Sequence, residues 1–136
     1  MRAATYSIPA VSGDTAAGEC AVNFFGPGQG GSVQDNVDRW KGQFVARDGK
    51  AAVAKVASRI VRGLKVTTVE TSGDYSGIDG PMAASPKTVL NYRLLGAIVE
   101  APGGRVFFKF TGPEKTVAAN AVKFDQLLAS LTPQTR

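Results

Sequence analysis

The feature that most constrains the fold is a predicted β-hairpin in the second half of the chain. Its first arm, Asn91 to Ala101, is almost continuously apolar, and its second arm, Arg105 to Thr111, contains three phenylalanines. The intervening Pro-Gly-Gly, residues 102–104, is typical of a tight turn. A strand that is apolar on both sides is typically buried on both faces, so the hairpin predicts a sheet that other elements cover.

A second hairpin is predicted upstream of the first. Leu64 to Glu70 is rich in β-branched residues, which favour strands, and this arm can continue to Tyr75. The preceding segment, Lys55 to Val61, is ambiguous, because its alanines and lysines favour helix whereas its apolar residues alternate as in a strand. We assign it as a strand, because Arg62 and Gly63 can form a two-residue turn between the two segments.

The first half of the chain predicts a strand, a tight turn and a helix. Alternating residues from Glu19 to Phe25 indicate a half-buried strand, and the glycines of residues 26–31 end it. Ser32 suits the N-cap of a helix from Val33 to about Gln43, in which Asp35 and Arg39 are spaced for an ion pair. The apolar face of this helix, which we expect to pack in the core, consists of Val33, Val37, Trp40 and Phe44.

The remaining segments complete the predicted order of elements. Thr5 to Pro9 is expected to form a short edge strand, Phe44 to Ala54 a loop, and Ser76 to Lys87 a long loop of the kind that often serves function. A last helix is expected after Thr111, with Thr111 as its cap and Glu114 completing a capping box. Its apolar face consists of Val117, Ala121, Phe124, Leu128 and Leu131, and Pro133 ends it.

These elements predict an α+β fold in one domain, residues 1–136. About six strands, mostly in hairpins, would form an antiparallel sheet flanked by two helices. A chain of 136 residues can bury a core of its own, since roughly two thirds of the unfolded surface is removed from water at this size.

The order of elements and four sequence segments resemble the PsbP-like family. The segments begin at residues 25, 36, 63 and 95 and read Phe-Gly-Pro-Gly-Gln-Gly-Gly, Asn-Val-Asp-Arg-Trp-Lys-Gly-Gln-Phe, Gly-Leu-Lys-Val-Thr-Thr-Val-Glu and Leu-Gly-Ala-Ile-Val-Glu-Ala-Pro. The chain also ends in a Phe-x-x-Leu-Leu-x-Ser-Leu pattern from Phe124 to Leu131. The resemblance covers nearly the whole chain and implies a three-layer α/β/α sandwich. It implies no catalytic residues, and it groups the chain with small bacterial proteins that are often exported lipoproteins.

Localisation follows from the resemblance and from the first residues of the chain. The N-terminus lacks the apolar core of a signal peptide and the cysteine of a lipobox. The resemblance therefore predicts a periplasmic or membrane-anchored protein that has lost a signal segment, with a cytoplasmic protein as the alternative. No apolar run reaches the roughly 20 residues of a transmembrane helix.

The residue types exclude several kinds of chemistry. The chain has no histidine and one cysteine, which rules out histidine-based triads, histidine metal sites, cysteine clusters and an internal disulfide. Cys20 alternates in phase with Val22 and Phe24, so we expect a buried core thiol. We predict no metal, no cofactor and no enzymatic activity, and a hydrolase that works without histidine is the third hypothesis for function.

Charge is concentrated between Arg39 and Lys65. This segment carries +7, whereas the whole chain carries +5. It predicts binding of an acidic protein or another anionic surface, and its alternative interpretation is a solvated basic face. Nucleic acid is disfavoured, because the segment lacks interleaved aromatic residues and a helix-turn-helix pattern. The predicted binding residues are Lys41, Arg47, Lys50, Lys55, Arg59, Arg62 and Lys65. The first hypothesis for function is therefore a non-catalytic binding or accessory module.

The second hypothesis concerns the glycine-rich turn before the first helix. A helix N-terminus that follows such a turn can bind an anion through backbone amides. The turn lacks the Gly-Lys-Ser/Thr ending of a P-loop and is not followed by a parallel βαβ unit, so a purely structural turn is the alternative. The predicted anion or ligand site consists of Gly28, Gln29, Gly30, Gly31, Ser32 and Arg39.

Overall fold

The computed structural model describes residues 2–10, 17–26, 29–46, 49–50, 52–76, 89–101 and 103–131. Gly28, Arg47, Pro133 and all but the first residue of the predicted Ser76 to Lys87 loop lie outside these ranges. The elements are β1 (Arg2–Ile8), β2 (Gly18–Phe25), α1 (Val33–Gly42), β3 (Phe44–Val45), β4 (Ala54–Val61), β5 (Leu64–Tyr75), β6 (Val89–Ala101), β7 (Gly104–Pro113), α2 (Glu114–Ala119) and α3 (Ala121–Ala129).

The strands form one antiparallel sheet of seven strands, which confirms the α+β class. Its order is β1-β2-β7-β6-β5-β3, and β4 pairs with β5 beside β3. Both predicted hairpins are present, β4 with β5 and β6 with β7. The turn of the first places Arg62 at φ 48° and Gly63 at φ 84°, the positive values that a two-residue hairpin turn requires.

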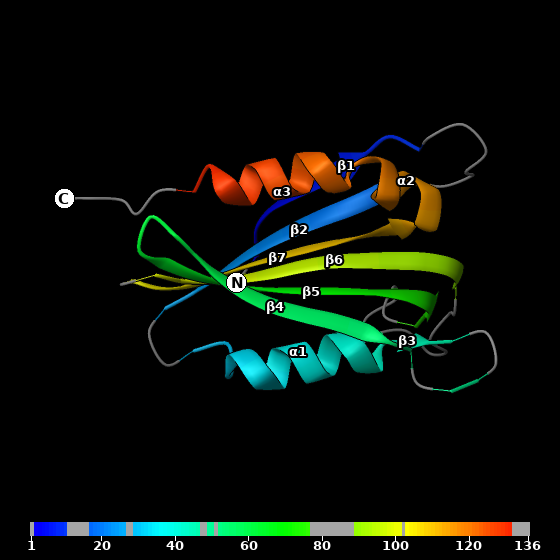
Figure 1. The fold of residues 1–136 in the computed structure, drawn as a ribbon, viewed down its shortest axis with the longest axis horizontal. Coiled ribbons are helices and arrows are strands. Elements are labelled where there is room, and N and C mark those ends of the chain that lie inside the picture. The colour runs from blue at the N-terminus through cyan, green and yellow to red at the C-terminus, as the bar shows by residue number, and fades with distance from the viewer. Residues whose placement is uncertain are drawn as a thin grey trace.

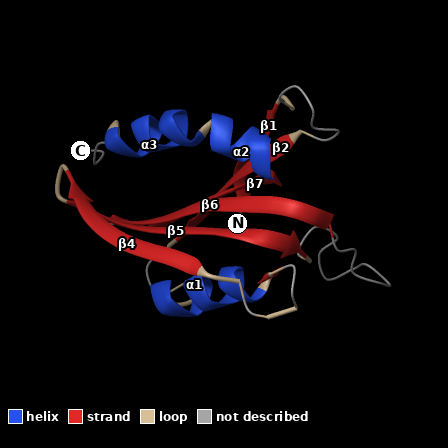
Figure 2. Ribbon diagram, turned by 45° about the vertical axis from the view of Figure 1, so that its right-hand side comes forward, coloured by secondary structure: helices blue, strands red, loops and turns tan. Residues whose placement is uncertain are grey.

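Helices cover the two faces of the sheet (Figures 1 and 2). Helix α1 lies against one face, and α2 and α3 lie against the other. Under α1 is a cluster of buried side chains from the helix, β5, β6 and β7, in which Trp40 and Phe107 meet edge to face at 6.2 Å. Under α2 and α3 the buried residues form two separate clusters.

Three predictions around the last helix are wrong. Strand β7 continues to Pro113 because its residues pair with Tyr92 and Arg93 of β6, so Thr111 lies in a strand and caps no helix. Glu114 begins α2 but reaches Arg93 instead of forming a capping box. The predicted single helix is interrupted at Asn120, whose side-chain amide donates to the Thr116 carbonyl, a local bond that competes with regular helix geometry.

The predicted loop from Phe44 to Ala54 is also partly wrong. Its first two residues form β3, which pairs with Asp74 and Tyr75. The rings of Phe44 and Tyr75 stack at 4.7 Å between centroids across this pair of strands. A strand of two residues is too short to produce a periodic pattern, so the sequence could not predict it.

Candidate functional site

Backbone carbonyls of the glycine-rich turn accept hydrogen bonds from neighbouring elements. Gly30 lies at φ 82°, and a Cβ there would come within 2.7 Å of the Phe25 ring, so the position requires glycine. Asn36 donates from Nδ2 to the Gly30 carbonyl at 2.8 Å, and Arg105 donates to the Gly31 carbonyl at 2.9 Å. These bonds fasten the turn to α1 and to β7.

The helix that follows begins as predicted. Ser32 is the N-cap, and its Oγ accepts a hydrogen bond from the Asp35 amide at 3.0 Å. Arg39 does not pair with Asp35; its Nη2 donates to Asn36 Oδ1 at 2.6 Å. Gln29 is exposed next to this turn. Anion binding at this site stays a prediction.

The two described arginines of the hairpin between β4 and β5 bind the last helix. Arg59 Nη2 lies 3.0 Å from Asp125 Oδ1 of α3. Arg62 Nη1 donates to the Ala129 and Leu131 carbonyls at 2.6 and 3.1 Å, where the negative end of the helix dipole favours a cation. These contacts join the hairpin to the C-terminal end of α3.

The lysines of the basic segment do not form one face. Lys55 on β4 and Lys65 on β5 are exposed on opposite faces of the sheet, because Lys55 lies beside α3 whereas Lys65 alternates with Leu64 and Val66, which pack on the α3 side. Lys41 lies on α1, and Lys50 is exposed after β3. The described lysines of this segment are therefore divided between α1, the residues after β3 and the two faces of the β4–β5 hairpin.

Strand β4 gives this edge its character. Among the described strands it pairs only with β5, and we call its outer edge, along which no described strand lies, the free edge. Large apolar side chains stand exposed along it: Val53 just before the strand is 91% exposed, Val56 48% and Ile60 68%. Val56 and Ile60 share the face opposite α3, since they alternate with Lys55 and Ala57, which lie on the α3 side. A free edge with apolar side chains and cations is the candidate binding site.

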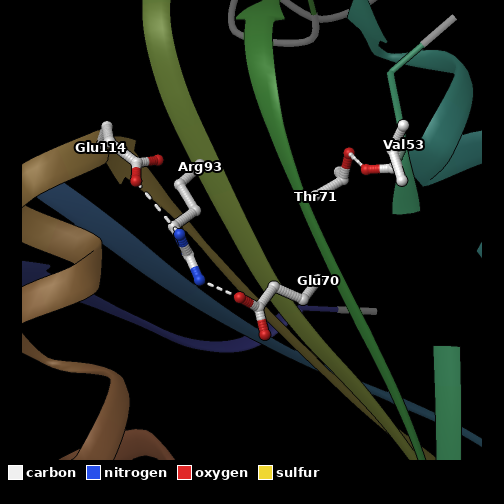
Figure 3. Close-up of polar contacts among 5 residues, drawn as sticks. All are labelled: Val53, Glu70, Thr71, Arg93 and Glu114. Carbon is white, nitrogen blue, oxygen red and sulfur yellow. Dashed lines mark hydrogen bonds and ion pairs between the residues drawn. The ribbon is translucent and has the colours of Figure 1, made fainter. Parts of the chain in front are cut away.

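Two polar contacts near the start of β4 involve Thr71 and Glu70 of the neighbouring strand β5 (Figure 3). Thr71 Oγ1 donates to the Val53 carbonyl at 2.9 Å, which fixes the residue that precedes the strand. Glu70, directly opposite Lys55 in the register, accepts from Arg93, and Arg93 also bonds Glu114 at 3.1 Å. The nearest carboxylate across the strand is thus engaged by an arginine.

A pocket that sequence reasoning missed lies under α3. It has a volume of about 430 Å³ and opens between this helix and strands β1, β2 and β7. Its strand side consists of Tyr6, Ile8, Cys20, Val22, Phe108 and Phe110. The sequence signal was present as the alternation of apolar residues in β1 and β2, but alternation alone cannot show that a covering helix leaves a space.

Two buried titratable groups are held in their neutral forms. Burial, with a smaller contribution from Glu19, raises the pKa of the Cys20 thiol. Burial raises the pKa of Tyr75 to about 12, with further contributions from Glu19 and Tyr92. Neither group is therefore activated as a nucleophile near neutral pH.

Two further properties concern the described residues. They contain no group of three or more cysteine, aspartate or glutamate side chains placed to hold a metal ion. Within the same residues, no helix is long and apolar enough to cross a membrane.

The fold resembles that of a solved structure whose sequence is very different. The crystal structure of PA94 from Pseudomonas aeruginosa, a protein of unknown function with a proposed regulatory role, superposes with a TM-score of 0.61 at 12% identity. The match covers 98% of this chain and 83% of PA94. No protein-family model matches the sequence, and no curated protein matches it. At this identity the likeness concerns the fold alone.

Proposed function

We propose that the protein is a non-catalytic binding module that adds an extended segment of an acidic partner protein to the free edge of β4. The observation that carries the proposal is the combination, on one edge strand, of unpaired backbone, exposed Val56 and Ile60, and the exposed Lys55. Extended peptides that extend a sheet gain affinity from main-chain hydrogen bonds and specificity from alternate side chains.

The side chains of β4 define the chemistry of the partner. A strand beside β4 would place one set of side chains next to Val56 and Ile60, and the other set on the α3 side next to Lys55. Apolar residues suit the first face and acidic residues the second. The partner segment is therefore extended and alternates acidic with apolar residues.

Lysine on an edge strand is also a common protection against unwanted pairing. That interpretation explains Lys55 but not its neighbours, because a protected edge avoids large exposed apolar side chains. Val53 and Ile60 are 91% and 68% exposed, so this edge keeps the apolar area that a protected strand would lose.

We also propose that the sandwich is of PsbP-like type. The support is the sequence resemblance, together with helices on both faces of one antiparallel sheet (Figure 2).

A peptide of alternating glutamate and valine, eight residues long and fluorescently labelled, tests the proposal by anisotropy. We expect binding that weakens as salt rises from 0.05 to 0.5 M on the order of tenfold, because exposed ion pairs are screened. A peptide with lysine in place of glutamate should not bind. Equal affinity at both salt concentrations would contradict the charge argument.

Matched variants locate the site. Ile60→Glu places a negative charge on the exposed face of β4 and should abolish binding of the acidic peptide, whereas Val122→Glu, on α3, alters a side chain of nearly equal exposure, 69% against 68%, and should not. Unchanged binding to the Ile60 variant would overturn the proposal. Vesicles of anionic lipid provide a further test. If the wild type binds them as tightly as the peptide and they displace the peptide, the preferred partner is a membrane surface and the proposal is overturned.

A further inference from the structure

We propose that the pocket under α3 binds the hydrocarbon chain of a single-chain amphiphile whose anionic head group pairs with Lys123. The pocket lies on the face of the sheet opposite Val56 and Ile60, and its use does not depend on the binding of a partner segment at the edge of β4. Its walls come from three strands and one helix that are distant in sequence.

The size and lining of the pocket suit an apolar chain. Protein cores are close-packed and contain few voids larger than a water molecule, whereas this pocket has a volume of about 430 Å³. That volume lies within the roughly 300–1,000 Å³ typical of small-molecule sites, which are predominantly apolar with a few polar groups. On the helix side it is lined by Asn120, Lys123, Phe124 and Leu127.

Exposure distinguishes the floor of the pocket from its mouth. Cys20 and Phe110 are 7% and 3% exposed, so they form the floor. Tyr6, 58% exposed, and the exposed Lys123 stand at the mouth. An amphiphile would place its chain against the buried side chains and its head group next to the two polar ones.

The charge of the lining selects the head group. Lys123 is the one charged residue among the described residues that line the pocket, and no carboxylate is among them. Asn120 donates from its side-chain amide to the Thr116 carbonyl, which holds it in place. A carboxylate or phosphate is therefore favoured at the mouth, and a quaternary ammonium is disfavoured.

The wall formed by α3 is itself only partly buried. Leu127, which lines the pocket, is 43% exposed, and Phe124 reaches the floor through its contact with Phe110 at 6.0 Å between ring centroids. A chain in the pocket would cover Leu127 and fill the space beside Phe124. Binding would thus remove from water an apolar surface that the folded protein leaves exposed.

Decanoate, decan-1-ol and decyltrimethylammonium are the probes, titrated into the full chain by calorimetry below their aggregation concentrations. We expect decanoate to bind more tightly than decan-1-ol, and decyltrimethylammonium to bind most weakly. Failure of decanoate to bind at millimolar concentration would overturn the proposal, and so would equal affinity for decanoate and decyltrimethylammonium.

Two pairs of variants locate the binding. Lys123→Gln should weaken the binding of decanoate about two- to fivefold, the effect of one exposed ion pair, and should leave the affinity for decan-1-ol unchanged. Lys115→Gln on α2 should change neither affinity. Leu127→Trp should fill the pocket and weaken both ligands about tenfold or more, whereas Val122→Trp on the exposed part of the same helix should not. Equal effects of the members of either pair would place the ligand elsewhere.

The single cysteine provides a second readout that does not depend on calorimetry. Cys20 lies in the floor, so decanoate should slow its alkylation by N-ethylmaleimide, and Lys123→Gln should reduce this protection. The single tryptophan, Trp40, lies in the other layer and should keep its fluorescence on binding. Faster alkylation, or a changed Trp40 spectrum, would show that decanoate unfolds the protein and would overturn the proposal.

Discussion

The two helical layers cover one sheet in different ways. In α1, Val37 and Trp40 are 2% and 3% exposed, and together with Phe44 they fill the space above β5, β6 and β7. In α3, Leu128 is the one buried residue, and Val122 and Leu127 remain 69% and 43% exposed. One layer is filled with aromatic side chains, whereas the other leaves a pocket beside it.

We infer that the α1 layer contributes most to stability, whereas the α3 layer is better suited to binding a ligand. A filled layer stabilises the fold because every side chain in it has close neighbours, and any change of volume is felt. A partly filled layer contributes less, but it offers apolar surface and space to a ligand. We expect substitutions under α1 to affect unfolding most, and substitutions at α3 to affect binding most.

Trp40→Ala tests this comparison with the largest expected effect. Removal of a fully buried indole should lower the free energy of unfolding by about 3–5 kcal/mol, as measured by urea denaturation and circular dichroism. Leu127→Ala on α3 is the matched change and should cost less than about 1 kcal/mol, because its side chain is already partly exposed. Similar losses for both would show that the two layers stabilise the fold equally.

Gly96→Ala tests how tightly the α1 layer is filled. A Cβ on Gly96 would come within 2.6 Å of the Trp40 ring, so the ring must shift, at a cost of about 1–3 kcal/mol. Gly42→Ala is the control, since a Cβ there has nothing within 4 Å and alanine favours the end of α1 by about 0.5 kcal/mol. An unchanged free energy of unfolding for Gly96→Ala would show that the α1 layer can accommodate an additional methyl group.

Tyr75 gives a pH-dependent test of the same layer. Its pKa is raised from 10.0 to about 12, so between these values the unfolded chain loses the proton that the folded chain keeps. Stability from this group is complete below pH 10 and is lost as pH rises towards 12, by about 2–3 kcal/mol. Tyr75→Phe should flatten the decline of unfolding free energy between pH 10 and 12. An unchanged slope would assign the decline to other groups.

Much of the fold could be predicted, because its signals are local. Ser32 was identified as an N-cap from its position before an amphipathic helix, and the turn at Arg62 and Gly63 from its place between two strand segments. Predictions failed where a long-range contact decided the outcome. Residues 111–113 stay in β7 because β6 pairs with them, although their sequence is typical of a helix start.

The candidate site was predicted less well, because charge along the chain does not show which charges are used. The sequence placed Arg59, Arg62 and Lys55 in one basic segment. In the structure both arginines contact α3, whereas Lys55 lies exposed at the free edge of β4. The exposed Val56 and Ile60 were visible as an alternating pattern, but periodicity does not show which face of an edge strand remains uncovered.

The sequence by itself determined most of the elements: both hairpins, the start of α1 and the apolar face of that helix. These depend on backbone preferences and on spacing within about ten residues. Only the tertiary structure decided that Trp40 fills its layer while α3 leaves a pocket, and that Arg62 reaches Ala129, 67 residues away. The reason is physical: filling and pairing depend on the shapes that distant segments present to each other, and no local pattern contains them.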